Sequence, residues 1–217
     1  MIKRIVFSLI VACVLPTVVS AANSKIEAKA QEWVASLELK DTEKERRVAA
    51  VIVEHLTAVD DWHLSHPASS VPEGINPETG RRLNELHRKI IADSAMPKTV
   101  HENLMNGLRK DLTEEQVEAI LDKYTIGKVD FTMRGYKAIV TDLTPEEEAF
   151  ILARLKEARE MAVDYKTMRQ ISAIFEIAKN KCEQHLIENG RNWRALYKAF
   201  VNKVKEEKEA KAKQENK

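Results

Sequence analysis

Apolar residues recur every three or four positions along almost the whole chain. This spacing gathers apolar side chains on one face of an α-helix, whereas a half-buried strand shows strict alternation of apolar and polar residues. Glycine and proline number only six each, so few positions favour a break in the helical pattern. The pattern therefore predicts an all-α fold, a single-domain bundle of about seven or eight helices.

One predicted helix carries several histidines on or beside its buried stripe and ends at a proline. Pro67 ends it because the residue before a proline avoids the α region. The phase of the stripe places His55 and His66 near the core and leaves Asp60 and His63 as the exposed pair. The stripe consists of Val48, Ile52, His55, Val59, Trp62 and His66.

Two segments are predicted to lack helical structure. The first is the proline-rich loop after Pro67, and Asn76 and Pro77 have the composition of a helix cap and first helical position, so the third helix is predicted to begin there. The second segment covers residues 124–132, where the alternation of Val129 and Phe131 indicates a short extended piece. A short helix is predicted over residues 133–140.

Charge excludes one class of partner. The chain has 35 basic and 34 acidic residues, so its charge is almost balanced. Nucleic acids require a strongly basic surface, and no nucleic-acid partner is therefore expected. The sequence also has no Gly-rich phosphate loop and no dinucleotide motif, and we predict no cofactor.

The first 21 residues are predicted to be an export signal. Lys3 and Arg4 form a basic start, an apolar run follows, and Ala21 ends a small-residue cleavage pattern. Residues 22–204 are predicted to form the helical domain, and the charged tail 205–217 a frayed helix or disorder. The expected location is periplasmic or extracellular, with no transmembrane segment after signal removal. Lipidation at Cys13 is the alternative mode of export, and Cys182 is the other cysteine.

Histidine pairs provide the first candidates for chemistry. His63 and His66 are three residues apart, so they can face the same way on a helix and are weak candidates for metal ligands. No third ligand follows from the spacing, and no metal site is predicted. Cys182 and His185 also share a helical stripe, but their neighbours are apolar, which favours a buried thiol over a catalytic pair.

Aromatic and basic residues near the second irregular segment provide further candidates. Tyr124 and Tyr136 flank this segment and are predicted to be exposed, where an aromatic ring can stack on a sugar. Lys128 and Arg134 lie close by in sequence and can bind an anion or a carboxylated sugar. The candidate binding residues are therefore Asp60, Trp62, His63, His66, Tyr124, Lys128, Arg134 and Tyr136.

Several stretches resemble a family known as a domain of unknown function, DUF3826. They are Leu112–Gln116, Tyr124–Val129, Gly135–Tyr136, Leu143–Glu148, Glu157–Asp164 and Glu188–Trp193. The resemblance implies an exported, all-helical protein of polysaccharide-degrading bacteria. It assigns no activity and no catalytic residue.

We therefore expect a binding or accessory protein in extracytoplasmic polysaccharide metabolism, with a glycan or an extracytoplasmic protein as its partner. The lack of a catalytic constellation favours this function over an enzyme. One alternative is a hydrolase or lyase that uses the corner from Asp60 to His66. The other is a periplasmic holdase-like chaperone, because Thr113–Gln116 resembles part of the Leu-Thr-x-x-Gln helix start that is repeated in such proteins.

Overall fold

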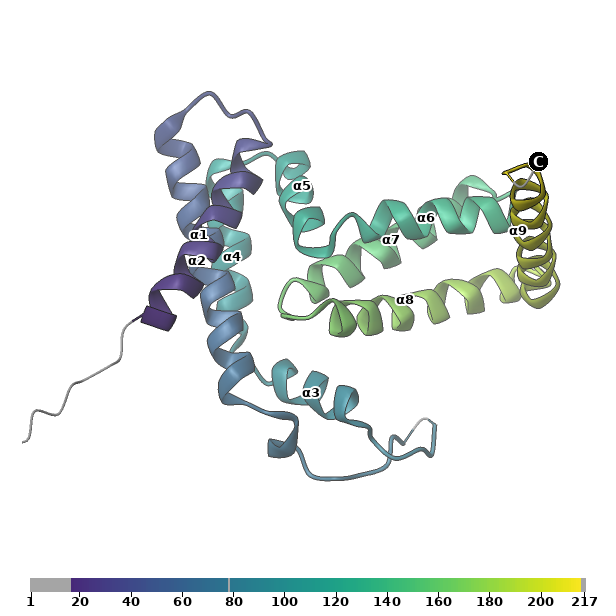
Figure 1. The fold of residues 1–217 in the computed structure, drawn as a ribbon, viewed down its shortest axis with the longest axis horizontal. Helices are drawn as coiled ribbons and strands as arrows, with labels where there is room; N and C mark the ends of the chain where they lie inside the picture. Colours follow the sequence, from purple (N-terminus) through teal and green to yellow (C-terminus); the bar gives the residue numbers. More distant parts are fainter. Residues whose placement is uncertain (1–16, 78, 216–217) are drawn as a thin grey trace, which may run out of the picture.

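The computed structural model describes residues 17–77 and 79–215, and Figure 1 shows their arrangement. Within these residues the chain forms nine α-helices, one short 3-10 helix and no β-strand, so the predicted all-α, single-domain fold is confirmed. The elements are α1 (Thr17–Ala35), α2 (Thr42–Ser65), η1 (Ala68–Ser70), α3 (Glu85–Ser94), α4 (Lys98–Asp111), α5 (Glu114–Thr125), α6 (Lys128–Ile139), α7 (Pro145–Ala162), α8 (Met168–Glu188) and α9 (Trp193–Glu215).

Two buried clusters of apolar side chains hold the helices together. In the first, α1, α2, α4 and α5 pack around Ile52, Leu108 and Ile120, each fully buried. In the second, α6, α7 and α8 pack around Leu155 and Leu186. Figure 1 shows the second group of helices running across the direction of α2 and α4. The junction between the two groups is therefore where polar side chains from distant parts of the sequence meet.

Three helices begin with the same arrangement of side chains. Thr113, Thr144 and Thr167 cap α5, α7 and α8, and each hydroxyl accepts from the amide three residues later. The side chain at that later position accepts in return from the backbone amide of the threonine, which completes a capping box. The starts of α5 and α7 follow directly from the sequence pattern, because a capping box needs only residues close together in the chain.

The third helix starts later than the sequence predicts. It begins at Glu85, and the side chain of Asn84 caps it by accepting from the amide of His87. Asn76 instead closes a turn, because its carbonyl accepts from the amide of Gly80, whose φ is 64°. The Asn-Pro pair therefore marks a turn in the long loop, and the predicted start at this pair is wrong.

The prediction that residues 124–132 are irregular is also wrong, because most of them are helical. Only Ile126 and Gly127 interrupt the helices, both with positive φ, at 54° and 62°. Helix α6 starts directly after them and runs twelve residues. Its phase buries Val129 and Tyr136 and leaves Phe131 exposed.

Replacing Ile126 with glycine is expected to stabilise the protein by about 1 kcal/mol. A β-branched residue is strained in the left-handed region, at a cost of roughly 1–2 kcal/mol, whereas glycine adopts it freely. The Ile126 side chain is 71% exposed, so little buried apolar contact is lost. Urea unfolding of both proteins measures the difference, and a less stable glycine variant contradicts this account of the turn.

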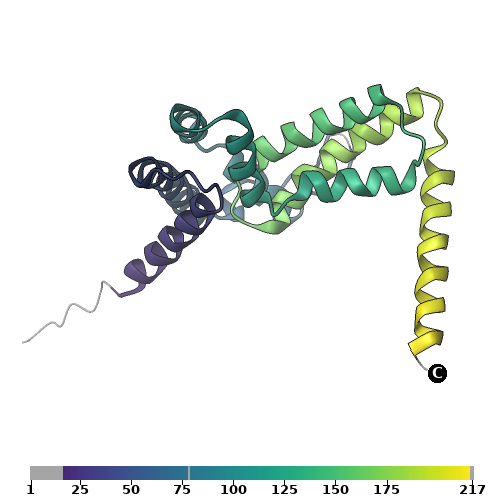
Figure 2. The same ribbon diagram turned by 90° about the horizontal axis from the view of Figure 1, so that it is seen from above.

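Helix α9 extends away from the rest of the molecule. It contacts α6 and α8 near its start, and Figure 2 shows its far end projecting from the bundle. The side chains of residues 205–213 are exposed, and the helix continues to Glu215. None of the helices within residues 17–77 and 79–215 is long and apolar enough to cross a membrane. The predicted lipidation site Cys13 and most of the predicted export signal lie outside the described residues.

Candidate functional site

Asp164 connects three helices that are distant in sequence. It lies two residues beyond the end of α7 and accepts hydrogen bonds from His55 of α2 and His101 of α4. The His55 Nε2 to Asp164 Oδ1 distance is 3.0 Å, and the His101 Nδ1 to Asp164 Oδ2 distance is 2.9 Å. Both imidazoles donate, because an ionised carboxylate only accepts. Each oxygen of the Asp164 carboxylate therefore orients one histidine.

The two histidines differ in exposure. His55 is 2% exposed, whereas the His101 side chain is 26% exposed and reaches solvent. The hydrogen bond to Asp164 raises the pKa of His101 above its ordinary value of 6.5, against the opposing effect of burial. Burial raises the pKa of Asp164, but the hydrogen bonds from His101 and His55 lower it by more. The pKa of Asp164 therefore lies below its ordinary value. His101 and Asp164 therefore favour the charged, paired state.

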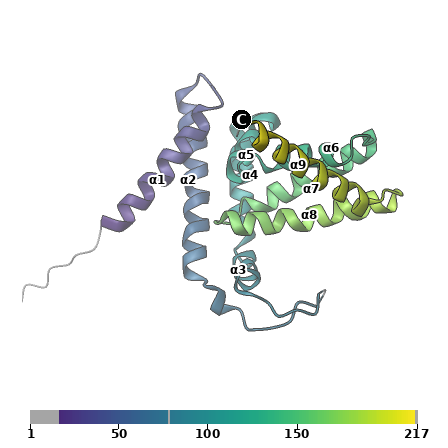
Figure 3. The same ribbon diagram turned by 45° about the vertical axis from the view of Figure 1, so that its right-hand side comes forward.

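A second carboxylate, which is buried, organises the lower part of the same junction. Asp93 of α3 is 4% exposed and contacts His63 of α2, Lys89 of α3 and Gln170 of α8 at 2.7, 2.8 and 2.7 Å. Lys89 also donates to the carbonyls of His63 and His66 at the end of α2. Figures 1 and 3 show α3 beside the lower end of α2, where these groups meet. This network closes the end of the helix and orients Asp93.

Both carboxylates line one cleft between the α3–α4 connection and α7. The cleft has a volume of about 560 Å³, within the range of small-ligand sites. His101 contributes its second ring nitrogen: Nε2 lies 3.6 Å from Glu160 Oε1, too far for a direct hydrogen bond. Burial, followed by the charges of Asp164 and Asp93, raises the pKa of Tyr165 to about 12, so this phenol stays protonated near neutral pH.

The charges in this cleft are mainly negative. Its basic groups are Lys98 and His101, and Met96, Pro97 and Met161 add apolar surface. Five carboxylic acids line it, namely Asp93, Glu102, Glu157, Glu160 and Asp164. Such a lining offers many hydrogen-bond acceptors and disfavours an anionic ligand.

The structure places the predicted Asp60–His66 corner beside this cleft rather than in it. Asp60 pairs with Lys166 at 3.1 Å, and the ring of Trp62 stacks on His66 with centroids 3.7 Å apart. The indole of Trp62 also donates to the carbonyl of Ala92. These side chains fix the end of α2, as expected of a helix terminator.

The predicted exposure of His63 is wrong. Its side chain is 17% exposed, and Nδ1 contacts Asp93, whereas Nδ1 of His66 faces the carbonyl of Trp62 at 3.0 Å. The two rings are therefore engaged with different partners. Among residues 17–77 and 79–215, no three or more His, Cys, Asp or Glu side chains are arranged to hold a metal ion.

The predicted exposure of Tyr124 and Tyr136 is also wrong. They are 8% and 3% exposed, and Tyr136 donates its hydroxyl to the carbonyl of Lys179. Tyr124 packs its ring against Trp33 and His55 in the first core cluster. Neither tyrosine is available for a ligand, because the segment that carries them is helical and these positions lie on its inner face.

His101, the residue with the clearest potential for chemistry, was not among the residues that the sequence predicts. His101 is 63 residues from Asp164, and its neighbours in α4 form no recognisable motif. For Cys182 the prediction is confirmed: it is fully buried, and burial raises the pKa of its thiol to about 11. A thiol with this pKa remains protonated and is a poor nucleophile.

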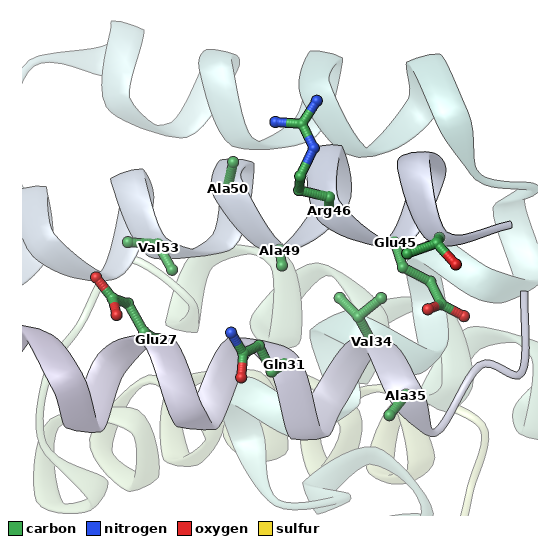
Figure 4. Close-up of a pocket in the computed structure, with 10 residues that line it drawn as sticks. Glu27, Gln31, Val34, Ala35, Glu45, Arg46, Ala49, Ala50 and Val53 are labelled. Atoms are coloured by element: carbon green, nitrogen blue, oxygen red, sulfur yellow. The ribbon is translucent and has the colours of Figure 1, made fainter.

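Another hollow lies between α1 and α2, with a volume of about 630 Å³. Figure 4 shows Val34, Ala49 and Val53 facing the space between the two helices, with Glu27 and Glu45 at its edges. The floor of this hollow is apolar, and its charged side chains are scattered rather than arranged as an acid–base pair. The cleft with His101 therefore has more groups capable of recognising a polar ligand.

The fold and the cleft define an all-helical protein in which a histidine and carboxylates converge in a polar hollow. The chain belongs to the family described as "Protein of unknown function (DUF3826)", whose model matches residues 23–206. The predicted resemblance to this family is confirmed. No curated protein matches the chain.

Proposed function

We propose that the cleft binds a neutral, hydroxyl-rich carbohydrate, and that the protein serves as a binding or accessory protein in extracytoplasmic polysaccharide metabolism. The observation that carries this proposal is the pair His101 and Glu160, whose facing atoms are 3.6 Å apart. An oxygen atom that hydrogen-bonds to both groups requires a somewhat larger separation, which a small movement of the Glu160 side chain provides. One sugar hydroxyl can accept from His101 Nε2 and donate to Glu160.

The surroundings of this pair support a neutral sugar. The Glu160 side chain is 46% exposed, so it can adjust to a hydroxyl between the two groups. Met96, Pro97 and Met161 provide apolar surface for the C–H face of a ring, and Tyr165 supplies a protonated phenol. The surplus of carboxylates repels an acidic sugar. Recognition by both donors and acceptors is what a hydroxyl group requires.

Protonation of His101 strengthens this arrangement. Only the protonated ring donates from Nδ1 to Asp164 and from Nε2 to the ligand at the same time. Asp164 and Glu160 both raise the pKa of His101, so the protonated form extends above pH 6.5. Affinity is therefore expected to fall as the pH rises through the pKa of His101.

Calorimetry with neutral oligosaccharides tests the proposal. Each of His101→Gln and Glu160→Gln is expected to weaken binding by about tenfold or more, the effect of losing one hydrogen bond to a charged group. His87→Gln on α3 and Glu146→Gln on α7 are matched controls at exposed positions. Absence of binding to any neutral glycan contradicts the proposal, as does equal binding by the His101 and Glu160 variants.

A second candidate function is a hydrolase or lyase. It is favoured by the orientation of His101, because Nδ1 is held by a carboxylate and Nε2 lies toward the cleft, as in a general base. The sequence placed such an activity at the Asp60–His66 corner, whereas this geometry favours His101. Product analysis after incubation with glycans distinguishes the two: products that disappear in His101→Gln favour the enzyme, and unchanged glycans favour the binding protein.

A further inference from the structure

We propose that the corner between α5 and α6 is a second ligand site, for a sugar ring that bears a carboxylate. The corner is an open hollow of about 480 Å³, defined here by Ile126, Lys128, Asp130, Phe131, Arg134 and Met168. None of these residues lines the cleft that contains His101. The proposal therefore stands independently of the one for the cleft.

The apolar surface of the corner is unusually exposed. Ile126 and Phe131 are 71% and 70% exposed, and Met168 at the start of α8 is 39% exposed. Burying an apolar side chain of this size stabilises a protein by roughly 1.5–3 kcal/mol, so leaving three in solvent forgoes a substantial contribution. The phenyl ring of Phe131 provides a flat apolar face on which a sugar ring can stack.

Two cations adjoin this apolar surface. Arg134 follows Phe131 by three residues on α6, which places both side chains on the same face of the helix. Lys128 stands at the first position of α6, with its Nζ 5.8 Å from the centre of the Phe175 ring. No carboxylate in the described part of the chain pairs with Lys128 or Arg134. A planar carboxylate matches the fork of an arginine and can accept two hydrogen bonds from it.

The charges of the corner favour a sugar over a membrane. The hollow is shallow and open, and Lys128, Asp130 and Arg134 place three charged groups beside its apolar side chains, whereas a helix that lies in a bilayer surface requires a continuous apolar face. A ligand with one carboxylate balances the net positive charge of the hollow, to which Lys128 and Arg134 contribute two positive charges and the exposed Asp130 carboxylate one negative charge. The Asp130 carboxylate can also accept hydrogen bonds from sugar hydroxyls. An acidic sugar is therefore complementary to the apolar, the basic and the acidic side chains of the corner.

The phase of α6 also decides which aromatic side chain lies beside the two cations. The predictions for Tyr136 and for the two cations came from the same segment, but the helical phase of α6 turns Tyr136 inward and Phe131 outward. The aromatic ring beside Lys128 and Arg134 is thus Phe131. In the predicted anion-binding pair Arg134 is exposed and Lys128 is half-buried, and the aromatic partner is different.

NMR titration with oligogalacturonate tests this site, using the fully methyl-esterified oligomer as the uncharged match. Oligogalacturonate is expected to shift the amide signals of α6, whereas the ester binds at least about tenfold more weakly, because it lacks the charged hydrogen bond to Arg134. Arg134→Gln and Phe131→Ala are expected to weaken oligogalacturonate binding to a similar extent. Both side chains are exposed, so thermal unfolding is expected to stay close to that of the parent protein.

Matched variants elsewhere separate this site from general surface effects. Arg194→Gln and Tyr197→Ala change an exposed arginine and an exposed aromatic residue on α9 and are expected to bind as the parent does. His101→Gln is also expected to retain oligogalacturonate binding, because it changes only the cleft. A variant that loses binding to neutral sugars but keeps binding to oligogalacturonate therefore bears on the cleft and not on the corner between α5 and α6.

Three outcomes overturn the proposal. They are no shift with oligogalacturonate, equal binding of the methyl ester, and unchanged affinity in both Arg134→Gln and Phe131→Ala. A parallel sedimentation with phosphatidylglycerol vesicles covers the lipid alternative. Binding to vesicles that depends on Phe131, without binding to the oligomer, assigns the corner to a membrane surface and excludes the sugar.

Discussion

Replacing Arg191 with alanine is expected to lower the free energy of unfolding by about 3 kcal/mol, the lower end of the usual cost of breaking a buried ion pair. Arg191 lies in the α8–α9 connection and donates two hydrogen bonds to Glu147, at 3.0 and 2.7 Å. It donates two more, both at 2.7 Å, to the side chain and carbonyl of Asp142. One guanidinium thus joins the α8–α9 connection to the α6–α7 connection.

The large effect arises because Glu147 remains buried after Arg191 is removed. Glu147 is 2% exposed and also completes the capping box with Thr144 at the start of α7. Hydrogen bonds from Arg191 lower the pKa of Glu147 to about 2, from an ordinary value of 4.5. A lowered folded-state pKa contributes stability that is present above pH 4.5 and is lost as the pH falls toward 2.

Urea unfolding at pH 7 and at pH 3 measures both effects. The parent protein is expected to lose stability on acidification, and Arg191→Ala is expected to lose less, because the lowered pKa of Glu147 depends on Arg191. Arg194→Ala, at an exposed position three residues later, is the control and is expected to change stability by less than about 0.5 kcal/mol. If both arginine variants unfold alike, the Arg191 pairing is not a major contribution.

Replacing Asp164 with alanine is expected to cost about 2 kcal/mol, because the buried His55 loses its hydrogen-bond acceptor and His101 loses its charged partner. The pKa shifts also set a pH dependence. The raised pKa of His101 contributes stability that is present below pH 6.5 and is lost as the pH rises through the folded-state pKa. The lowered pKa of Asp164 contributes above its ordinary value of 3.8 and is lost on acidification.

Unfolding measured at pH 6 and pH 9 isolates the contribution of Asp164. The parent protein is expected to be less stable at pH 9, and Asp164→Ala is expected to show a smaller difference between the two pH values. Asp130→Ala removes an exposed acid from α6 and serves as the control, with the pH dependence of the parent. An equally steep dependence in Asp164→Ala shows that the His101–Asp164 pair is not its source.

The sequence predicts the helices well because helix formation depends on neighbouring residues. The capping boxes at Thr113 and Thr144 and the stop at Pro67 involve partners at most three residues apart, so pattern alone locates them. The predicted burial of side chains is wrong where one residue changes the phase of the helix that follows it. Ile126 takes up a left-handed conformation that its residue type disfavours, and the helix that follows buries the tyrosine expected to be exposed.

The candidate site could not be predicted in the same way. His55 and Asp164 are 109 residues apart, and only the packing of α2 and α4 against the end of α7 brings His55 and His101 to one carboxylate. The buried position of His55 does follow from its place on the apolar stripe. Lys128 and Arg134 were identified by residue type, whereas Phe131 depended on knowing where α6 begins.

The most direct test of the cleft is an NMR measurement of the pKa of His101 with and without a saturating neutral oligosaccharide. A hydroxyl that accepts from Nε2 favours the protonated ring, so the ligand is expected to raise this pKa, and affinity is expected to fall with pH by the linked amount. The signals of His87, exposed on α3, provide an internal control. A His101 pKa that is the same in the free and the saturated protein contradicts binding between His101 and Glu160.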